Sequence, residues 1–364
     1  MIGAKRVIDM HVHLAGPGDG FPQDLRWSES FERGIGFAAL KILKGWSFRR
    51  VTDDLMIETL KREALRAESL DLAVVLALDR VYDADGSSHG FEQADPALNL
   101  TTLYVSNRIV ADLCRPGTKL LPGISVHPFR DDALEELDRY RDRAVLCKWL
   151  PSAQRIDFED TRDVARVKLD RFYAKLAQLK MPLLFHAGVE SSIPTTDERF
   201  DRFNNPRYIE RALDLGATVI VAHCGCSYFD LIQDNVVEET LSLFRRMKAE
   251  GKPWDLYADI SALFSPFRAR KILDKVFGRR AGSEGIPPER LIYGSDFPNP
   301  ARGRRELFLR PFLRYRRAKL LERGVRIADK WLTYYFDQAT SDLVLTNFDR
   351  LLVSLGRGET LPGR

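Results

Sequence analysis

Histidines gather at the ends of short apolar runs in this sequence. It contains six histidines, and five of them stand at or just after the ends of runs that are typical of buried strands. His89 is the exception, because it lies in a segment with the composition of a loop. Imidazole binds transition metals and exchanges protons near neutral pH, so the distribution indicates metal or acid-base chemistry at strand ends. The five are His11, His13, His127, His186 and His223.

The first two of these histidines are separated by one residue. His11 and His13 belong to the run Ile8-Asp9-Met10-His11-Val12-His13. Side chains alternate along a strand, so both imidazoles are expected on one face, roughly 6 to 7 Å apart. That spacing lets both reach one ion. A structural or surface pair is the competing interpretation, and the position at the end of the first strand favours the metal site.

Two further histidines and one aspartate end later apolar runs. His186 and His223 each close a run too apolar to bury a histidine without a partner, although a satisfied core histidine is the alternative. Asp296 follows Leu291–Ser295, where an aspartate also suits a helix cap. Three histidines and one carboxylate at strand ends are nevertheless a ligand set that zinc prefers.

Eight apolar runs alternate with charged amphipathic stretches along the chain. Apolar strands separated by helices are typical of a parallel sheet, and eight such units favour an α/β fold closed into a (β/α)₈ TIM barrel over a doubly wound sheet. Active sites of such barrels form at the carboxyl ends of the strands. The predicted strands are Val7–His13, Leu70–Leu78, Leu120–Val126, Val145–Leu150, Pro182–Ala187, Thr218–His223, Leu256–Ser261 and Leu291–Ser295.

Two regions depart from the repeat. Residues 14–50 form a long insertion after the first strand that is rich in Gly, Trp and Phe. This insertion either covers the site as a lid or simply packs against the end of the barrel. From Lys330 onward, segments such as Leu343–Leu355 predict extra C-terminal helices. Amphipathic patterns also predict helices over Asp53–Glu68 and Arg166–Leu179. No boundary is visible, so the whole chain is expected to be one domain.

Composition narrows the classes of partner. Lysine and arginine total 56 against 52 acidic residues in a chain of 364, and this balance argues against nucleic acid. Strand-like sequence begins at Val7 and no apolar run reaches the roughly 18 residues of a membrane span, so no membrane is expected and the expected location is cytoplasmic. The four cysteines predict no disulfide framework. The sequence leaves open whether the protein forms a homo-oligomer.

Lys148 lies in the fourth apolar run, Val145–Leu150. A lysine in such surroundings must find an anion, shift its pKa or reach water. If it pointed outward, its ammonium would lie unpaired in the apolar layer between sheet and helices, which is costly. The side chain is therefore expected to point into the barrel, toward the metal.

Three residues after strand ends are candidates for contact with substrate. His127 ends the third strand, and a packing role is equally open for it. Arg130 and Arg155 also follow strand ends, and a guanidinium suits a carboxylate, although most arginines are simply solvated. The expected partner is a small-molecule substrate, with a carboxylated one among the alternatives.

Taken together, the motifs resemble the amidohydrolase superfamily, specifically its amidohydrolase-related (amidohydrolase 2) branch of metal-dependent hydrolases and decarboxylases. The similarity rests on Ile8–His13, on the histidines after the fifth and sixth strands, and on Gly294–Pro298 after the eighth. Thr346–Leu352 also resembles the way such chains end. The resemblance implies that the divalent metal is held by His11, His13, His186 and Asp296.

The same resemblance implies roles for the remaining residues. Asp296 would also accept a proton from water, whose pKa a divalent ion can lower from about 15.7 to near 7. His223 would polarise the substrate or bind a second metal. Some members carbamylate a lysine at the position of Lys148, so this residue would bridge two metals, offer the substrate a cation or form a structural ion pair. Zinc is expected, as one ion, or as two if Lys148 is carbamylated.

The function implied is a hydrolase that acts on a carbonyl centre of a small molecule, an ester, lactone or amide, through metal-activated water. Non-oxidative decarboxylation of an aromatic or unsaturated carboxylic acid is the alternative. A nuclease of the related deoxyribonuclease group is disfavoured, because that group carries glutamate on the fourth strand and a Thr-Asp pair on the eighth, where this chain has Lys148 and Ser295-Asp296. A non-catalytic barrel is disfavoured because every expected ligand position is filled.

Overall fold

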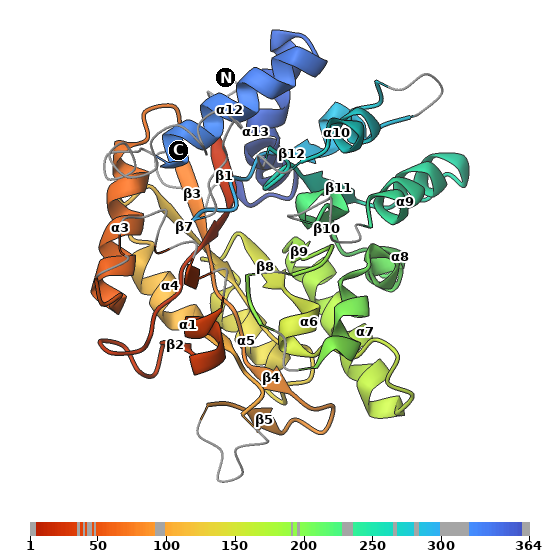
Figure 1. Ribbon diagram of the computed structural model, residues 1–364. Coiled ribbons are helices and arrows are strands. Elements are labelled where there is room, and N and C mark those ends of the chain that lie inside the picture. The colour runs from red at the N-terminus through yellow and green to blue at the C-terminus, as the bar shows by residue number, and fades with distance from the viewer. Residues whose placement is uncertain are drawn as a thin grey trace.

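An eight-stranded parallel sheet forms the centre of the molecule, and helices lie around it (Figure 1). Its strands are β1 (Ile8–His13), β3 (Leu72–Leu76), β7 (Leu120–Ile124), β8 (Leu146–Trp149), β9 (Leu183–Phe185), β10 (Val219–Val221), β11 (Leu256–Asp259) and β12 (Leu291–Ile292), adjacent in that order. The computed structural model describes residues 5–34, 37–38, 41, 46, 49–91, 99–190, 192–194, 197–227, 236–264, 268–279, 284–298 and 320–358.

The sheet curves until its first and last strands meet. Val12 forms a parallel bridge with Phe297, just beyond β12. The backbone N–H of His13 donates to the carbonyl of Phe297 at 2.8 Å, and that of Asp296 donates to the carbonyl of His11 at 3.0 Å. The chain therefore forms a nearly closed barrel of eight parallel strands, and the predicted TIM-barrel fold is confirmed.

Each of the eight predicted strands is present, and each is shorter than the apolar run that predicted it. The missing residues lie mostly at the carboxyl ends, where the chain leaves the sheet. His223 follows β10 with a φ of 57°, and Asp296 follows β12 with a φ of 59°. A left-handed residue cannot continue a strand, so these positions end the sheet and begin the loops that carry polar side chains.

Helices follow most of the strands, as the amphipathic patterns predict. Thr52 caps the amino end of α3, where its side-chain oxygen accepts from the N–H of Leu55 at 3.2 Å. The predicted helix over Asp53–Glu68 is α3 (Asp53–Arg66), and the one over Arg166–Leu179 lies within α7 (Asp163–Leu179). The others before the C-terminal pair are α1 (Glu29–Arg33), α4 (Asn107–Leu113), α5 (Ala133–Tyr140), α6 (Pro151–Gln154), α8 (Glu210–Asp214), α9 (Val237–Ala249) and α10 (Arg270–Val276), with 3₁₀ turns η2 (Glu198–Asn204), η3 (Pro206–Ile209), η4 (Ala222–Gly225) and η5 (Pro288–Arg290).

The extra C-terminal helices are α12 (Leu320–Tyr335) and α13 (Gln338–Ser354). Phe348 of α13 is fully buried, in the same apolar cluster as Ile8 and Leu72 at the amino ends of their strands. An ion pair of 3.0 Å between Arg6 and Asp349 joins the same surfaces. α13 therefore closes the amino-terminal end of the barrel, opposite the end where an active site forms.

Two excursions lie beside the carboxyl ends of the strands. In the first, residues 14–50, β2 (Leu25–Trp27) pairs antiparallel with β6 (Leu103–Val105). The carboxylate of Asp53 accepts N–H donors from Gly18, Gly20 and Phe21 at 2.8 to 3.0 Å, which ties this insertion to α3. The second lies between β3 and β7, where the hairpin of β4 (Val81–Tyr82) and β5 (Ser88–His89) precedes β6 and the helix α4.

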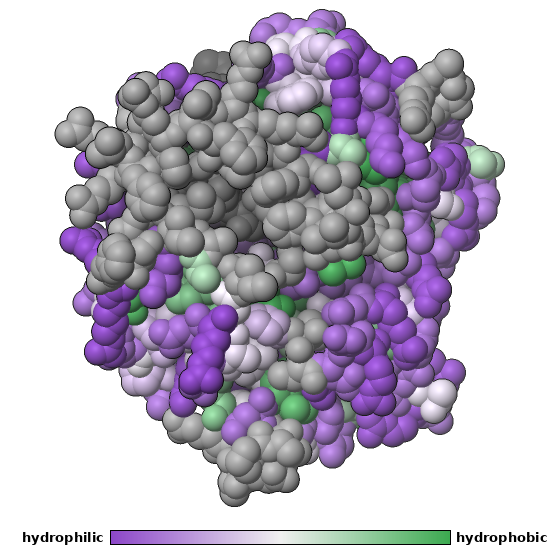
Figure 2. Space-filling view, viewed as in Figure 1, coloured by the Kyte–Doolittle hydropathy of each residue, from purple (hydrophilic) through white to green (hydrophobic). Residues whose placement is uncertain are grey.

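The surface gives little sign of a large apolar interface on the face seen in Figure 2. Where the structure describes it, that face is mainly hydrophilic, and hydrophobic side chains form small separate groups. Within the described part of the chain, no helix is long and apolar enough to cross a membrane.

Candidate metal centre

A bulge in β1 decides which side chains enter the site. The register of β1 against β3 shifts between Asp9 and Val12, so β1 holds one residue more than its neighbour there. Met10 packs in the inner core, and simple alternation would then turn His11 outward. The bulge allows both Met10 and His11 to lie inside the barrel, and it leaves His13 on the same side as His11.

Three of the four predicted ligands come together where β1 meets β12. Oδ1 of Asp296 lies 3.1 Å from Nε2 of His13 and 3.8 Å from Nε2 of His11. Ligand atoms of these three residues all lie within 4.8 Å of one another. Gly294 permits this approach, because a Cβ atom at that position would lie only 2.8 Å from the Cβ of His11.

His186 and His223 lie next to each other at the ends of β9 and β10, with ring centroids 5.2 Å apart. Nε2 of His186 is buried and has no hydrogen-bond partner. Nδ1 of His223 lies 2.8 Å from Oγ and 3.2 Å from the carbonyl oxygen of Ser261. Among the described residues, His186 is not part of a group of three with ligand atoms within 4.8 Å, so the structure places the fourth predicted ligand beside His223.

Lys148 lies inside the barrel and is 1% exposed. Its Nζ is 3.4 Å from Nε2 of His11, so the predicted inward orientation is confirmed, while its chemical role stays a prediction. Burial lowers the pKa of Lys148 to about 8, although Asp259, Asp296 and Glu190 oppose this shift by attracting the ammonium.

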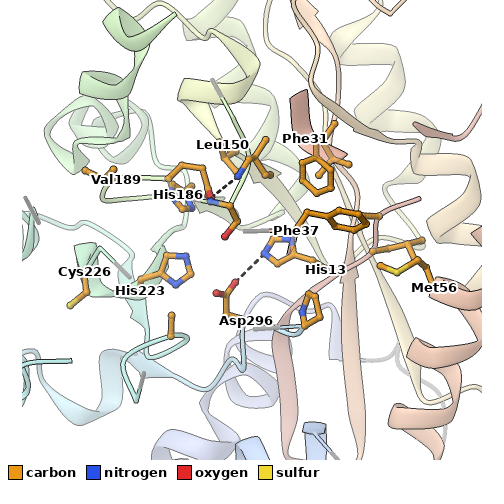
Figure 3. A pocket seen from close by; sticks show the side chains of 18 residues that line it. His13, Phe31, Phe37, Met56, Leu150, His186, Val189, His223, Cys226 and Asp296 are labelled. Atoms are coloured by element: carbon orange, nitrogen blue, oxygen red, sulfur yellow. Dashed lines mark hydrogen bonds and ion pairs between the residues drawn. The ribbon is translucent and has the colours of Figure 1, made fainter. Parts of the chain in front are cut away.

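Four of the predicted site residues border a cavity at the carboxyl ends of the strands (Figure 3). His13, His186, His223 and Asp296 project into it. Other lining residues are Leu14, Ala15, Phe31, Phe37, Met56, Leu103, Leu150, Val189, Glu190, Ser192, Ile193, Cys226, Ala262 and Pro298. Because Phe31 and Phe37 belong to the insertion of residues 14–50, part of that insertion forms a wall of the site.

A comparison against known families identifies the family of this chain. A family model described as Amidohydrolase matches residues 8–313. The chain belongs to the amidohydrolase family. The match runs from the first strand past Asp296, and it therefore includes every residue of the centre described above.

Solved structures with a similar fold include an amidohydrolase II, 14% identical, with a TM-score of 0.47 over 96% of this chain and 100% of that chain. A metal-dependent hydrolase from Lactobacillus casei is 13% identical, with a TM-score of 0.45 over 99% and 97%. A mutant organophosphorus hydrolase from Deinococcus radiodurans is 14% identical, with a TM-score of 0.45 over 96% and 92%. A comparison with curated proteins finds no match. The family assignment rests on the family model.

Burial favours the neutral, metal-binding form of three imidazoles of this amidohydrolase, those of His11, His186 and His223. Burial lowers the pKa of His11 and His186 well below the usual value, and the nearby charge of Lys148 lowers both further. Burial also lowers the pKa of His223 to about 4. Burial alone would raise the pKa of Asp296, but the hydrogen bond with His13 and the neighbouring imidazoles outweigh it and hold this pKa below its usual range. At neutral pH the centre thus offers the neutral imidazoles of His11, His186 and His223 and the ionised carboxylate of Asp296.

Asp259, near the end of β11, links two of the histidines and is absent from the sequence-based prediction. Its Oδ2 lies 2.9 Å from Nδ1 of His11, and its Oδ1 accepts the backbone N–H groups of His223 and Ser261 at 3.0 and 2.9 Å. The hydroxyl of Ser261 also donates to Oδ1. A carboxylate that accepts from Nδ1 fixes the tautomer of His11 and leaves Nε2 with a lone pair for a metal. In the sequence, the one sign of this role is that Asp259 is an acidic residue within a buried apolar run.

Glu190 is the second residue that sequence reasoning missed. Its side chain is 10% exposed and lines the cavity, with Oε2 3.6 Å from Nε2 of His186. Burial raises the pKa of this carboxyl. In the sequence it lies in a loop four residues beyond His186, and only that short spacing signals its position.

The three candidates for substrate contact lie elsewhere. The backbone N–H of Phe129 donates to Nδ1 of His127, whose Nε2 donates to the carbonyl of Gln154, so both ring nitrogens are occupied by structural bonds. Burial lowers the pKa of His127 to about 3, which agrees with this neutral form. None of the three is among the residues found lining the cavity.

The two arginines are engaged with partners other than the predicted metal ligands. Arg130 donates to Asp132 through Nε and Nη2, and its Nη1 lies 3.1 Å from Asp79. The guanidinium of Arg155 lies over the ring of Phe200, 5.3 Å from its centroid. The structure therefore does not bring either guanidinium together with the histidines, and the pairing of Arg130 with acidic side chains explains why.

We predict that Asp259→Asn weakens metal binding about 10- to 100-fold, as measured by competition with a chromophoric chelator. Both oxygens of Asp259 accept from donors, so an asparagine must turn its NH₂ group toward one of them. Asp255→Asn, a change just before the same strand, serves as control and should bind metal normally. Equal affinities in Asp259→Asn and the unmodified protein would show that Asp259 does not support the centre.

Proposed function

We propose that this amidohydrolase is a metal-dependent hydrolase that acts on a carbonyl centre of a small molecule, an ester, lactone or amide. The observation that carries the proposal is the convergence of His13, His186, His223 and Asp296 on one cavity from four different strands. Residues at the carboxyl ends of several strands are the usual source of catalytic groups in this fold.

The donor set fits a divalent transition ion. Nε2 of His186 is buried with no hydrogen-bond partner, which is costly unless an ion or a substrate group completes it. His11, His13 and Asp296 would hold one ion, and a set of imidazole and carboxylate ligands favours zinc. Such an ion, once bound, polarises a carbonyl group and lowers the pKa of water to about 7.

Asp296 is the residue suited to accept a proton. Its carboxylate is ionised at neutral pH and reaches the cavity beside His13. A carboxylate in that position can orient an attacking water and take its proton as the water adds to the carbonyl carbon. The proton then passes to the leaving oxygen or nitrogen.

His223 is better suited to ligation than to polarising a substrate. Its Nδ1 lies 3.2 Å from the carbonyl oxygen of Ser261, which can only accept, so Nδ1 carries the proton. The neutral ring then has a lone pair on Nε2 and cannot donate from it. We infer that His186 and His223, whose rings are adjacent, hold a second ion when Lys148 is carbamylated.

The lysine supports this inference by its position. In the uncharged form of the side chain, Nζ can add to carbon dioxide, which forms an N–C bond and releases one proton. As an ammonium it would instead donate to the Nε2 lone pair of His11, 3.4 Å away, and compete with the metal for that atom. Carbamylation removes this competition and supplies oxygen ligands between the two groups of histidines.

The rest of the cavity indicates the kind of substrate. Phe31 and Phe37, with ring centroids 5.6 Å apart, form part of an apolar wall together with Met56 (Figure 3). This wall suits a ring or branched apolar group beside the reacting carbonyl. Among the described residues, Arg130 and Arg155 do not line the cavity, and the apolar wall supports an uncharged group beside the reacting carbonyl of the substrate.

The first test of the proposal is Asp296→Asn. The variant should keep much of its metal through the histidines but lose about 100- to 10,000-fold in turnover, because a proton acceptor is removed. Turnover is measured on a panel of aromatic lactones, esters and amides, with metal content determined in the same samples. Near-normal turnover in Asp296→Asn would remove Asp296 from the mechanism, and release of carbon dioxide from aromatic acids in place of hydrolysis would support decarboxylation instead.

The second test reads out the chemistry of Lys148 by metal stoichiometry. We expect two zinc ions per chain in the protein and one or none in Lys148→Ala, because the bridging carbamate is lost. Lys168→Ala, a change at a lysine that pairs with Asp131 at the surface, should retain two ions. One ion in both Lys148→Ala and the unmodified protein would rule out the bridge.

A further inference from the structure

Two polar atoms of largely buried side chains face each other across a short gap beside the cavity. They are Nε2 of His186 and Oε2 of Glu190, which lie 3.6 Å apart. The side chains are only 8% and 10% exposed, and Nε2 of His186 has no hydrogen-bond partner. Both residues line the cavity. Neither the family resemblance nor the sequence motifs give Glu190 a role.

The separation of these atoms suits a shared ion better than a direct contact. At 3.6 Å an N–H···O interaction is too long to count as a hydrogen bond. Two ligand atoms that each lie about 2.1 Å from one zinc ion, at an angle of roughly 110 to 120°, are separated by about 3.4 to 3.6 Å. The gap thus has the width that one coordinated ion requires.

The loop that carries Glu190 holds the carboxylate in this position. Oε1 accepts the backbone N–H groups of Ser192 and Ile193 at 2.5 and 3.1 Å, so the carboxylate is fixed and Oε2 is the oxygen left toward His186. The chain returns to His186 through Gly188, whose φ of 93° lies in the region that glycine alone adopts freely. Little conformational entropy remains to be lost when an ion binds.

We propose that Oε2 of Glu190 is a ligand of the same ion that Nε2 of His186 binds. The inference rests on the proposed function in that it requires a metal centre, but it holds for one ion or for two. The additional carboxylate brings a negative charge to the side of the site where His186 and His223 supply neutral imidazoles. It also makes the centre richer in carboxylate ligands than the resemblance implies.

Glu190→Gln tests the proposal with almost no change of shape. The amide oxygen must replace Oε1, because that position faces two N–H donors, so the NH₂ group replaces Oε2. An amide nitrogen has no lone pair for a metal. Zinc affinity, measured by chelator competition and equilibrium dialysis, should fall at least about 100-fold, beyond what loss of a supporting contact causes.

Three comparisons make the result decisive. His186→Ala should lose the same ion as Glu190→Gln, whereas Ser192→Ala keeps the backbone donor and should bind zinc normally. In the cobalt-substituted protein, the visible spectrum of Glu190→Gln at saturating cobalt should differ from that of Ser192→Ala. Circular dichroism checks that the variants are folded.

Normal zinc affinity together with an unchanged cobalt spectrum in Glu190→Gln would overturn this inference alone, and would leave Glu190 to contact substrate. Failure of the unmodified protein to bind any divalent ion would overturn the proposed function together with it. The two failures are therefore distinguishable.

Discussion

The meeting of β1 with the chain beyond β12 is the constraint on which the site depends. Hydrogen bonds across this seam fix the backbone of His11 and His13 against that of Asp296 and Phe297. They bring the side chains of His11, His13 and Asp296 together. Gly294 is required at the seam because a side chain there would collide with His11. The bulge in β1 contributes to the same arrangement, because it lets His11 and His13 point into the barrel while Met10 stays in the apolar core.

Hydrogen bonds at Nδ1 set the orientation and the tautomer of two histidines in the site. His11 and His223 each have Nδ1 engaged, with Asp259 and with Ser261, so each directs a lone pair from Nε2. Because burial keeps these rings neutral, the charge of the centre comes from the carboxylates of Asp259, Asp296 and Glu190 and from the ammonium of Lys148. The proposed number of bound ions therefore depends on whether Lys148 is present as an ammonium or as a carbamate.

Sequence predicted the barrel and the convergence of strand-end residues, because apolar runs and their polar ends are local features of the chain. It could not predict the bulge, which depends on the register between β1 and β3. It also missed Asp259 and Glu190, whose importance arises from contacts with residues on other strands or across a loop. The pairing of Arg130 with Asp79 is likewise a long-range contact that the sequence does not reveal.

We infer that His11, His13 and Asp296 hold a divalent ion at the seam between the first and last strands. A crystal structure of the zinc-loaded protein, with anomalous scattering recorded at the zinc edge, tests it most directly. We expect a strong peak at about 2.0 to 2.2 Å from Nε2 of both histidines and from the Asp296 carboxylate. No peak at this position, or zinc held instead among His11, His223 and Asp259, would contradict the account.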